Sequence, residues 1–459
     1  MESILLIQPN YRHTKETGVW MVNVPLGLCY IAAVLRNKGF KTEILDANAL
    51  NLSPEETAKH AVGFDAVGVS GMTPAHGFIK ELANCLPKTT LKIAGGPHAS
   101  GFPEKLLDAG YDVVVRGEGE YTILEIMEGK EYGQIKGLSY RKGSKIFHNQ
   151  DREPIDPDSI PLPARDLLPS NGVDMPYQGM GVQYMPWSPI FTSRGCPFDC
   201  YFCNKKVFGR CFRKRSPESV LNEVEMLVKQ YGVKEIDIYD DTFNADLARA
   251  EKIVDMIIER KLDIKIRFSN GIRADKITES FLRKLKKAGC IYIAYGIESG
   301  NQDVLDRLGK NLKLEQVRFA VKLTKKIGIP VTGFFVLGLL GDNEKTMQQT
   351  IDFAKELDLD IAQFTIATPY PGTKFHELVK QNGKFLTEEW ENVYHSSGKM
   401  VYTYPGTASP EIVEEMYKKA FREFYFRPSY LIKKIARIRS IGELKMIFRG
   451  VKSIIRIGA

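Results

Sequence analysis

Residues 191–203 read FTSRGCPFDCYFC and bring Cys196, Cys200 and Cys203 together in a C-x3-C-x2-C pattern. Three thiolates at this spacing suit an iron–sulfur cluster, for which cysteine is the usual ligand. A cluster of four irons held by three cysteines leaves one iron open to bind another molecule. The alternative is a zinc site, which would normally require a fourth Cys or His nearby, and Cys211 is the only candidate. The spacing favours the iron–sulfur cluster.

The same motif resembles the cluster motif of the radical S-adenosylmethionine (SAM) enzymes, with Tyr201 and Phe202 in the usual apolar-aromatic slot. The resemblance implies that the three cysteines are catalytic residues and the metal ligands of a [4Fe–4S] cluster. It also implies that the open iron binds SAM.

The composition is that of an ordinary globular protein. The 459 residues are 43% hydrophobic and 26% charged, and this length suggests about three domains. No apolar run approaches the roughly 18 residues of a membrane span, and residues 1–10 are too short for a signal peptide. Seven cysteines, three of them clustered, fit metal binding in a reducing compartment better than a disulfide framework. We therefore expect a cytoplasmic protein.

The net charge of +8 is concentrated near the C-terminus. Residues 418–456 hold twelve Lys or Arg against two acids, Glu423 and Glu443. The rest of the chain is close to neutral, so we expect no nucleic-acid partner.

Short apolar runs alternate with helical patterns in the first third of the chain. Strands are expected at residues 4–7, 42–45, 66–69, 91–94 and 113–115, and helices at residues 26–37, 54–62, 75–86 and 103–108. This alternation predicts an α/β fold with a Rossmann-like, doubly wound parallel sheet, in which ligands bind beyond the carboxyl ends of the strands. The candidate binding residues at those ends are Ser70, Gly71, Thr73, Gly95, Gly96, His98, Gly117, Glu118 and Glu120.

The layout, with GGPHAS after the fourth strand and RGEGE after the fifth, resembles the cobalamin-binding domain that precedes the cluster domain in one branch of radical SAM enzymes. The resemblance implies that the residues just named bind cobalamin, as methylcobalamin. Cobalamin domains often carry an Asp-x-His-x-x-Gly loop whose histidine ligates cobalt, but here the loop reads PNYRHTKETG and His13 has no Asp two residues before it. The axial ligand of cobalt is left open, and His98 is interpreted as a loop residue of its motif. The alternative is a purely structural Rossmann-like module.

The central part of the chain repeats the alternation with longer helices. Strands are expected at residues 190–192, 235–239, 265–268, 291–295, 331–337 and 361–366, and helices at residues 219–230, 247–260, 279–288, 314–327 and 344–356. Six such units predict a partial (β/α)6 barrel with its chemistry at the C-terminal ends of the strands. Six units also match the partial barrel of the radical SAM enzymes.

Four regions follow from these patterns. Residues 1–145 are predicted to form the cobalamin-binding domain and residues 146–189 a connector, because prolines this dense form neither helix nor central strand. Residues 190–400 are predicted to form the radical SAM core, and residues 401–459 a basic helical extension.

The strand ends of the predicted barrel carry a second set of candidates. By resemblance, Asp240, Asp241 and Thr242 lie where the SAM amino group binds, and a carboxylate suits an ammonium. Arg273 would pair with the SAM carboxylate. The ribose and adenine segments, with the loop after the sixth strand, add Gly296, Glu298, Ser299, Gly338 and Pro371. The alternative for the acids is ordinary helix capping.

The resemblance implies an enzyme that cleaves SAM to methionine and a 5′-deoxyadenosyl radical and methylates an unactivated carbon. It further implies a small-molecule substrate and a reductant such as flavodoxin or ferredoxin. The alternatives are cyclisation or rearrangement with the same cofactors, as in the anaerobic porphyrin-ring cyclase, a non-catalytic corrinoid or cluster carrier, and a tRNA-modifying relative.

The C-terminal extension is expected to contain a helix at residues 409–426 and two short amphipathic helices, the second opened by a capping box from Ser440 to Glu443. Its apolar face and its lysines and arginines are compatible with lying on an anionic membrane surface. Peripheral contact at the inner face of the membrane would suit a lipid or isoprenoid substrate. The alternative is a helical cap that packs on the barrel.

Overall fold

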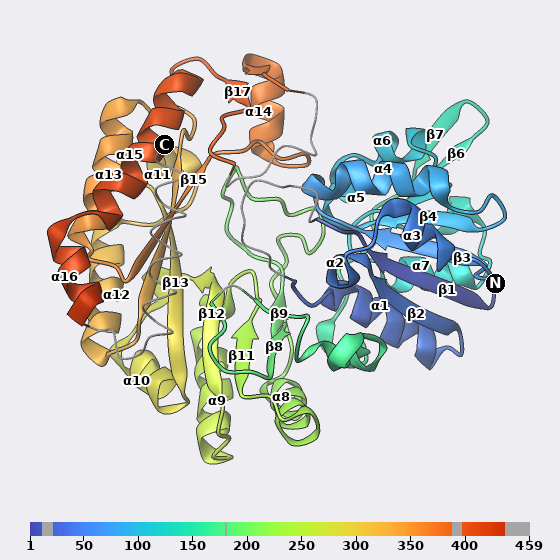
Figure 1. Cartoon of the computed structure of the whole chain (residues 1–459), viewed down its shortest axis with the longest axis horizontal. Coiled ribbons are helices and arrows are strands. Elements are labelled where there is room, and N and C mark those ends of the chain that lie inside the picture. Colours follow the sequence, from blue (N-terminus) through green and yellow to red (C-terminus); the bar gives the residue numbers. More distant parts are fainter. Residues whose placement is uncertain (12–21, 180, 388–396, 437–459) are drawn as a thin grey trace.

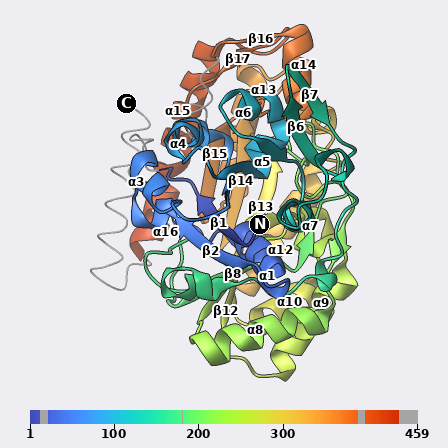
Figure 2. The same cartoon turned by 90° about the vertical axis from the view of Figure 1, so that its right-hand side faces the viewer.

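Two parallel sheets, one in each lobe, form the frame of the molecule (Figure 1). The structure is a computed structural model, and it describes residues 1–11, 22–179, 181–387 and 397–436. Figure 2 looks onto the N-terminal lobe, which lies in front of the strands of the second lobe.

The first sheet has the strand order β2-β1-β3-β4-β5-β6-β7. Its strands are β1 (Ser3–Gln8), β2 (Lys41–Asp46), β3 (Ala66–Ser70), β4 (Leu91–Gly95), β5 (Val113–Val115), β6 (Leu138–Lys142) and β7 (Lys145–His148). β1 to β5 are parallel, and β6 and β7 add an antiparallel edge. The predicted doubly wound sheet is confirmed.

Helices cover both faces of this sheet. Successive side chains of each strand point to opposite faces, so each strand contributes to the core on both sides. Ile4 and Leu6 pack with α1 (Leu26–Asn37) and α7 (Glu120–Met127). Leu5 and Ile7 belong to the core on the opposite face, which α3 (Pro54–Lys59), α4 (His76–Cys85) and α6 (Pro103–Asp108) cover. Fully apolar strands are expected wherever both faces of a sheet are buried.

The second sheet is parallel throughout and has the order β15-β14-β13-β12-β11-β8. Its strands are β8 (Trp187–Ile190), β11 (Glu235–Ile238), β12 (Lys265–Ile272), β13 (Cys290–Glu298), β14 (Val331–Leu337) and β15 (Ile361–Ile366). The main helices between and after them are α8 (Pro217–Tyr231), α9 (Leu247–Glu259), α10 (Glu279–Lys287), α12 (Leu314–Ile327), α13 (Glu344–Glu356) and α15 (Pro410–Tyr425). Strands that neighbour one another in chain order, each followed by a helix, make the predicted six-unit partial barrel.

Several details differ from the sequence expectations. The first sheet continues to His148, so the boundary predicted at residue 145 falls at the first residue of β7. The segment after β4 forms a short helix, α5 (Gly96–Gly101), instead of an open loop. Four more α-helices were not anticipated: α2 (Ala47–Leu50), α7, α11 (Gln302–Leu308) and α14 (Lys374–Asn382). α16 (Pro428–Ala436) is the first of the two expected tail helices, and the second lies outside the described residues.

The connector is tied to the barrel by a buried ion cluster. Arg165 and Glu223 are 1% and 0% exposed, and their side chains lie 2.9 Å apart. Arg165 also donates to the carbonyl of Pro189, and Arg215 pairs with the second carboxylate oxygen of Glu223. One carboxylate of α8 therefore holds two arginines, one from the connector and one from the barrel.

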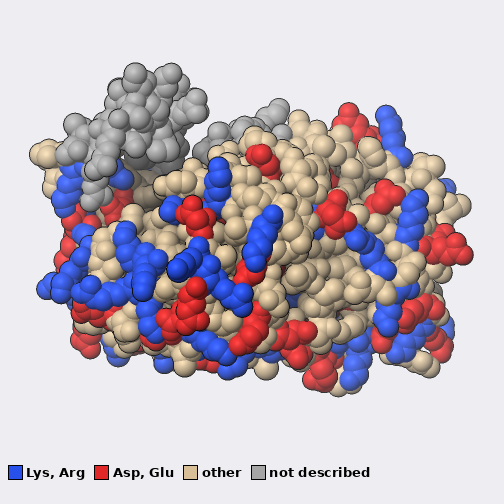
Figure 3. Space-filling view, turned by 90° about the horizontal axis from the view of Figure 1, so that it is seen from below, with Lys and Arg blue, Asp and Glu red and all other residues tan. Residues whose placement is uncertain are grey.

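Charge is unevenly distributed on the face seen from below. Lys and Arg gather toward the left of Figure 3, on the side of the barrel lobe, while both signs mix over the remainder. In that lobe the exposed lysines Lys286, Lys287 and Lys326 lie at the C-terminal ends of α10 and α12, where cations interact favourably with the helix dipole. Within the described part of the chain, no helix combines the length and apolarity that crossing a membrane requires.

Replacing Glu223 tests the buried ion cluster. We expect Glu223→Ala to lower the free energy of unfolding by about 3–5 kcal/mol, because it leaves two guanidinium groups buried without their carboxylate. Glu225→Ala, on the same helix, removes only ion pairs with the surface cations Lys229 and Arg260 and should change the midpoint far less, since surface pairs contribute about 0–1 kcal/mol each. Guanidinium-chloride unfolding of both variants decides the matter, and equal midpoints would contradict this account.

Candidate functional site

The three cysteines share one loop at the carboxyl end of β8. The loop, residues 195–212, begins after β9 (Ser193–Arg194) and ends at β10 (Arg213–Lys214). Partial burial raises the pKa of the Cys196 and Cys200 thiols above the ordinary value. Binding of a positively charged metal centre beside them would favour the thiolate form.

Gly195 closes the base of this loop. Its φ is +80°, and a Cβ there would overlap the carbonyl oxygen of Cys211 and lie 3.0 Å from that of Phe208. Only glycine combines this backbone angle with so close an approach. Lys205 adds a second constraint, since its Nζ donates to the carbonyl of Cys196 at 3.2 Å.

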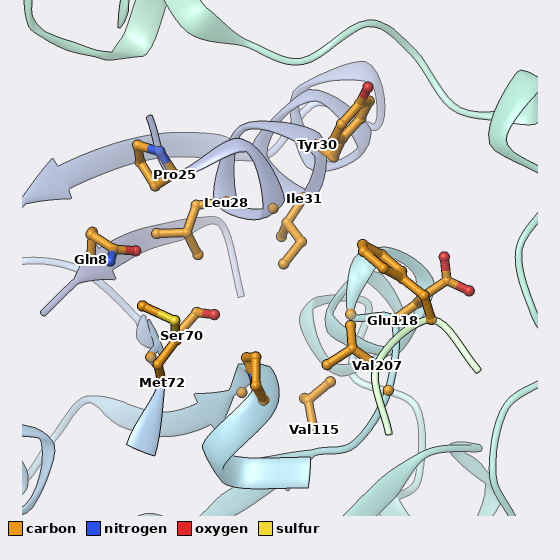
Figure 4. Close-up of a pocket in the computed structure, with 18 of the residues that line it drawn as sticks. Gln8, Pro25, Leu28, Tyr30, Ile31, Ser70, Met72, Val115, Glu118 and Val207 are labelled. Atoms are coloured by element: carbon orange, nitrogen blue, oxygen red, sulfur yellow. The ribbon is translucent and has the colours of Figure 1, made fainter. Parts of the chain in front are cut away.

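A cavity of about 700 Å³ lies between the two lobes. Figure 4 shows Leu28, Ile31 and Val115 of the first lobe and Val207 of the cysteine loop around it. The sequence-predicted residues in its wall come from both lobes, and they are Ser70, Gly71, Gly95, Gly96, Gly117, Glu118, Glu120, Cys196, Cys203 and Asp241. The cavity thus unites the carboxyl ends of the two sheets.

The glycines in the wall differ in how closely other atoms approach them. A Cβ on Gly96, whose φ is +89°, would lie 2.6 Å from the Ser70 hydroxyl oxygen, and one on Gly71 would lie 2.8 Å from Ile79. These two glycines are needed for the strand ends to pack against their neighbours. A Cβ on Gly95 or Gly117 would instead make only ordinary van der Waals contacts, at 3.7 Å or more, so neighbouring atoms do not exclude a side chain at these two positions of the wall.

His98 and Thr73 do not line the cavity. The His98 ring is buried, with its Nε2 2.9 Å from Nδ1 of His76 and its Nδ1 3.4 Å from the Thr73 hydroxyl. Burial lowers the pKa of His98 to about 3, which keeps the imidazole neutral. Its ring packs edge-on against Phe102, which in turn contacts His376 of the second lobe. His98 therefore belongs to the contact between lobes.

The acids of the RGEGE segment form ion pairs across the interface. Glu118 lies 2.7 Å from Arg194 and 2.7 Å from Arg213, and Glu120 lies 2.8 Å from Arg194. Sequence reasoning missed both arginines, although Arg194 stands two positions before the first cysteine. Arg194 is the only charged residue between Asp174 and Asp199, and this isolated charge was the signal that could have identified it.

The two aspartates after β11 point in different directions. Asp240 is buried and accepts hydrogen bonds from the Thr192 and Ser193 side chains and from the Thr192 amide. Asp241 lies in the cavity wall and accepts from the Gly195 amide at 3.1 Å. Burial raises the pKa of Asp241, and the nearby Lys205 opposes the shift. The Thr242 hydroxyl is buried and has no hydrogen-bond partner among the described residues.

The remaining barrel candidates do not line the cavity. The Arg273 guanidinium lies 3.7 Å from the centre of the Phe198 ring and donates to the carbonyls of Lys310 and Asn311. Glu298, at φ 71°, pairs with Lys310.

Four further candidates have structural contacts. The carbonyl of Pro371 accepts from Asn204 at 3.1 Å, next to Cys203 in sequence. Ser299 contacts Thr350, and Gly338 packs against Val413 of α15. Gly296 has the Glu298 carboxylate and the Lys310 ammonium within 3 Å of the position of a Cβ.

Gly195→Ala tests the geometry of the loop. We expect the variant to take up much less iron on anaerobic reconstitution, because the strained backbone alone costs about 1–3 kcal/mol and the new methyl group displaces the carbonyl of Cys211. Gly209→Ala is the matched control, since Gly209 has φ +73° but open space around it. Equal iron content in the two variants would contradict the role assigned to Gly195.

Comparison with known proteins assigns both lobes. The model of the radical SAM superfamily matches residues 190–354, and the model of the B12 binding domain matches residues 21–127. A protein of Pyrococcus horikoshii described as an uncharacterized methyltransferase is 34% identical over 467 residues, which cover 99% of this chain and 98% of that protein. The cytidylyl-2-hydroxyethylphosphonate methyltransferase of Streptomyces wedmorensis is 28% identical and covers 93% of this chain and 90% of its own.

Solved structures share the fold over the same span. The radical SAM methyltransferase TsrM from Kitasatospora setae, with cobalamin and a [4Fe–4S] cluster bound, superposes with a TM-score of 0.71 at 18% identity and covers 94% of this chain and 90% of its own. OxsB, a cobalamin-dependent SAM radical enzyme with aqua-cobalamin bound, gives a TM-score of 0.74 at 18% identity, with 100% and 72% covered. With a relative 34% identical along its whole length and both domain models matched in order, the chain belongs to the radical SAM enzymes that carry an N-terminal B12-binding domain.

Proposed function

We propose that this protein is a cobalamin-dependent radical SAM methyltransferase that transfers a methyl group to an unactivated carbon of a small molecule. The observation that carries the proposal is the shared cavity, whose wall contains the strand ends of the B12-binding domain together with Cys196, Cys203 and Asp241. A corrinoid and a cluster bound at these two sets of residues would face the same enclosed space.

The chemistry of the residues fits the groups they would hold. Cys196, Cys200 and Cys203 are free thiols on one loop, which suits a cluster with one open iron. Gly95 and Gly117 line the cavity without side chains of their own, which suits the close approach of a flat macrocycle, and the side chains of Leu28, Ile31 and Val115 offer it an apolar surface. Of Asp240 and Asp241, only Asp241 lines the cavity, so its carboxylate is the one that would bind the ammonium group of SAM.

When bound, these cofactors supply a 5′-deoxyadenosyl radical, formed by one-electron cleavage of SAM, and a methyl group for transfer. The residues of the chain position them and exclude water, as is general for cofactor enzymes. Lys205 and Asp241 place opposite charges in the cavity wall beside the cysteine loop. Arg273, stacked on Phe198, holds the loop against the segment around Lys310.

Relatives favour methyl transfer. The proteins named above as 34% and 28% identical are both described as methyltransferases. Two anaerobic magnesium-protoporphyrin IX monomethyl ester cyclases are 26% and 28% identical but cover 64% and 70% of their own length. Cyclisation is thus the second candidate, and it uses the same site.

The cysteine triad can be tested by SAM cleavage. We expect the wild type to form 5′-deoxyadenosine when incubated anaerobically with SAM, a strong reductant and hydroxocobalamin, and Cys196→Ala to form none. Cys211→Ala, on the same loop but outside the triad, should retain cleavage. Undiminished 5′-deoxyadenosine from Cys196→Ala would refute the proposal. Carrying out the reaction with methyl-deuterated SAM and a metabolite extract from a strain lacking this gene separates methylation, which labels a product, from cyclisation, which does not.

The substrate class rests on the tail and stays a prediction. α16 exposes Leu431 and Ile432 at 36% and 67% beside Lys433 and Lys434, a combination that suits an anionic lipid surface. We expect the full chain to float with vesicles containing anionic phosphatidylserine, and a chain ending at Tyr430 to stay at the bottom of the gradient. Equal flotation of both chains would remove the argument for a lipid or isoprenoid substrate.

A further inference from the structure

One carboxylate of the B12-binding domain holds both ends of the cysteine loop. β9 and β10 pair antiparallel, with Arg194 opposite Arg213, so these two arginines stand where the loop leaves and re-enters the barrel. Arg194 Nη1 lies 2.7 Å from Glu118 Oε1, and Arg213 Nη1 lies 2.7 Å from Glu118 Oε2. A displacement of Glu118 would therefore disturb an ion pair at each end of the loop.

Further contacts fix the orientation of this group. Glu120 lies 2.8 Å from Arg194, and the amide of Ile155 donates to Glu118 Oε2 at 3.0 Å. We refer to Glu118, Glu120, Arg194 and Arg213 as the interdomain ion cluster. It contains two carboxylates and two guanidinium groups, so its formal charges balance.

The interdomain ion cluster is almost completely buried. Glu118, Glu120 and Arg194 are 7%, 4% and 3% exposed. The Arg194 guanidinium lies 4.9 Å from the ring centre of Tyr30 on α1 and 5.3 Å from that of Phe208 on the cysteine loop. Buried ion pairs tolerate little displacement, because a charge that loses its partner away from water is strongly destabilised. The cluster thus favours one position of the loop relative to the first domain.

The same residues form part of the cavity wall. Glu118, Gly119, Glu120 and Arg194 line it, together with Phe208. The backbone of the RGEGE segment also approaches the loop directly, since a Cβ on Gly117 would lie 3.7 Å from the carbonyl oxygen of Lys206. A ligand that fills the cavity would therefore contact both the interdomain ion cluster and residues of the cysteine loop.

We propose that the interdomain ion cluster couples the two cofactor sites, so that a corrinoid in the cavity and an iron–sulfur cluster on the loop each strengthen binding of the other. Glu118 and Arg213 act as positioning residues, through the loop and not on the substrate. The inference rests on the two cofactors of the proposed function. Coupling of binding is reciprocal by thermodynamic necessity, so it can be measured from either side.

The first measurement is the Kd of hydroxocobalamin for cluster-free and anaerobically reconstituted protein. We expect reconstitution to tighten binding by about fivefold or more in the wild type, the lower end of common allosteric couplings. In Glu118→Gln the ratio of the two Kd values should fall to about one, whatever the substitution does to the Kd of the cluster-free protein. The reciprocal measurement is the rate at which an iron chelator removes the cluster, which added hydroxocobalamin should slow in the wild type but not in Glu118→Gln.

Glu125→Gln is the matched control. Glu125 is also a carboxylate of the first domain held by two cations, Lys130 and Arg152, but it does not line the cavity. It should keep the wild-type ratio. Arg213→Gln is a milder second variant, because Arg194 keeps its pairs with Glu118 and Glu120. It should also lower the ratio of the two Kd values, by less than Glu118→Gln does.

The outcomes separate the claims. A wild-type ratio of one, or a wild-type ratio preserved in Glu118→Gln, overturns the inference and leaves the proposed function standing. If Glu118→Gln does not fold, a wild-type ratio in Arg213→Gln has the same meaning. Failure of the wild type to bind hydroxocobalamin at all would overturn the proposed function together with the inference.

Discussion

The carboxyl ends of two parallel sheets meet at one cavity, and the rest of the site depends on this arrangement. Parallel sheets expose their loops at the carboxyl ends of the strands, which is why doubly wound sheets and barrels bind ligands there. In this chain the loops after β3, β4 and β5 meet the loops after β8 and β11. Groups that neither sheet could enclose alone are thereby surrounded on two sides.

Holding two sheets in this relation requires directional contacts, and buried ion pairs supply them. Glu118 takes one arginine on each carboxylate oxygen at the domain interface, and Glu223 does the same between the connector and the barrel. Apolar packing alone tolerates sliding, whereas an arginine–carboxylate pair has a defined geometry. The desolvation of these charges is costly, so they stabilise the molecule only in the arrangement where all of them are paired.

Neighbouring residues at a strand end take different roles for a simple reason. Successive side chains in extended backbone point to opposite sides. Asp240 consequently turns inward to Thr192 and Ser193, while Asp241 faces the cavity. His98 also follows a glycine-rich strand end, but it lies within the helix α5 and packs between His76 and Phe102 rather than in the cavity wall. Position after a strand thus identifies a candidate, and the direction of its side chain decides its contacts.

The sequence by itself determined the two sheets, their order along the chain and the cysteine loop, because apolar periodicity and cysteine spacing are local properties of the chain. It also located Asp241 and Glu118 near their strand ends. Only the tertiary structure decided that Glu118 reaches Arg194 and Arg213, because those partners are 76 and 95 positions away and nothing in local spacing pairs them. It also decided at which glycines of the cavity wall a side chain would clash and at which it would not, since that depends on atoms brought from other strands.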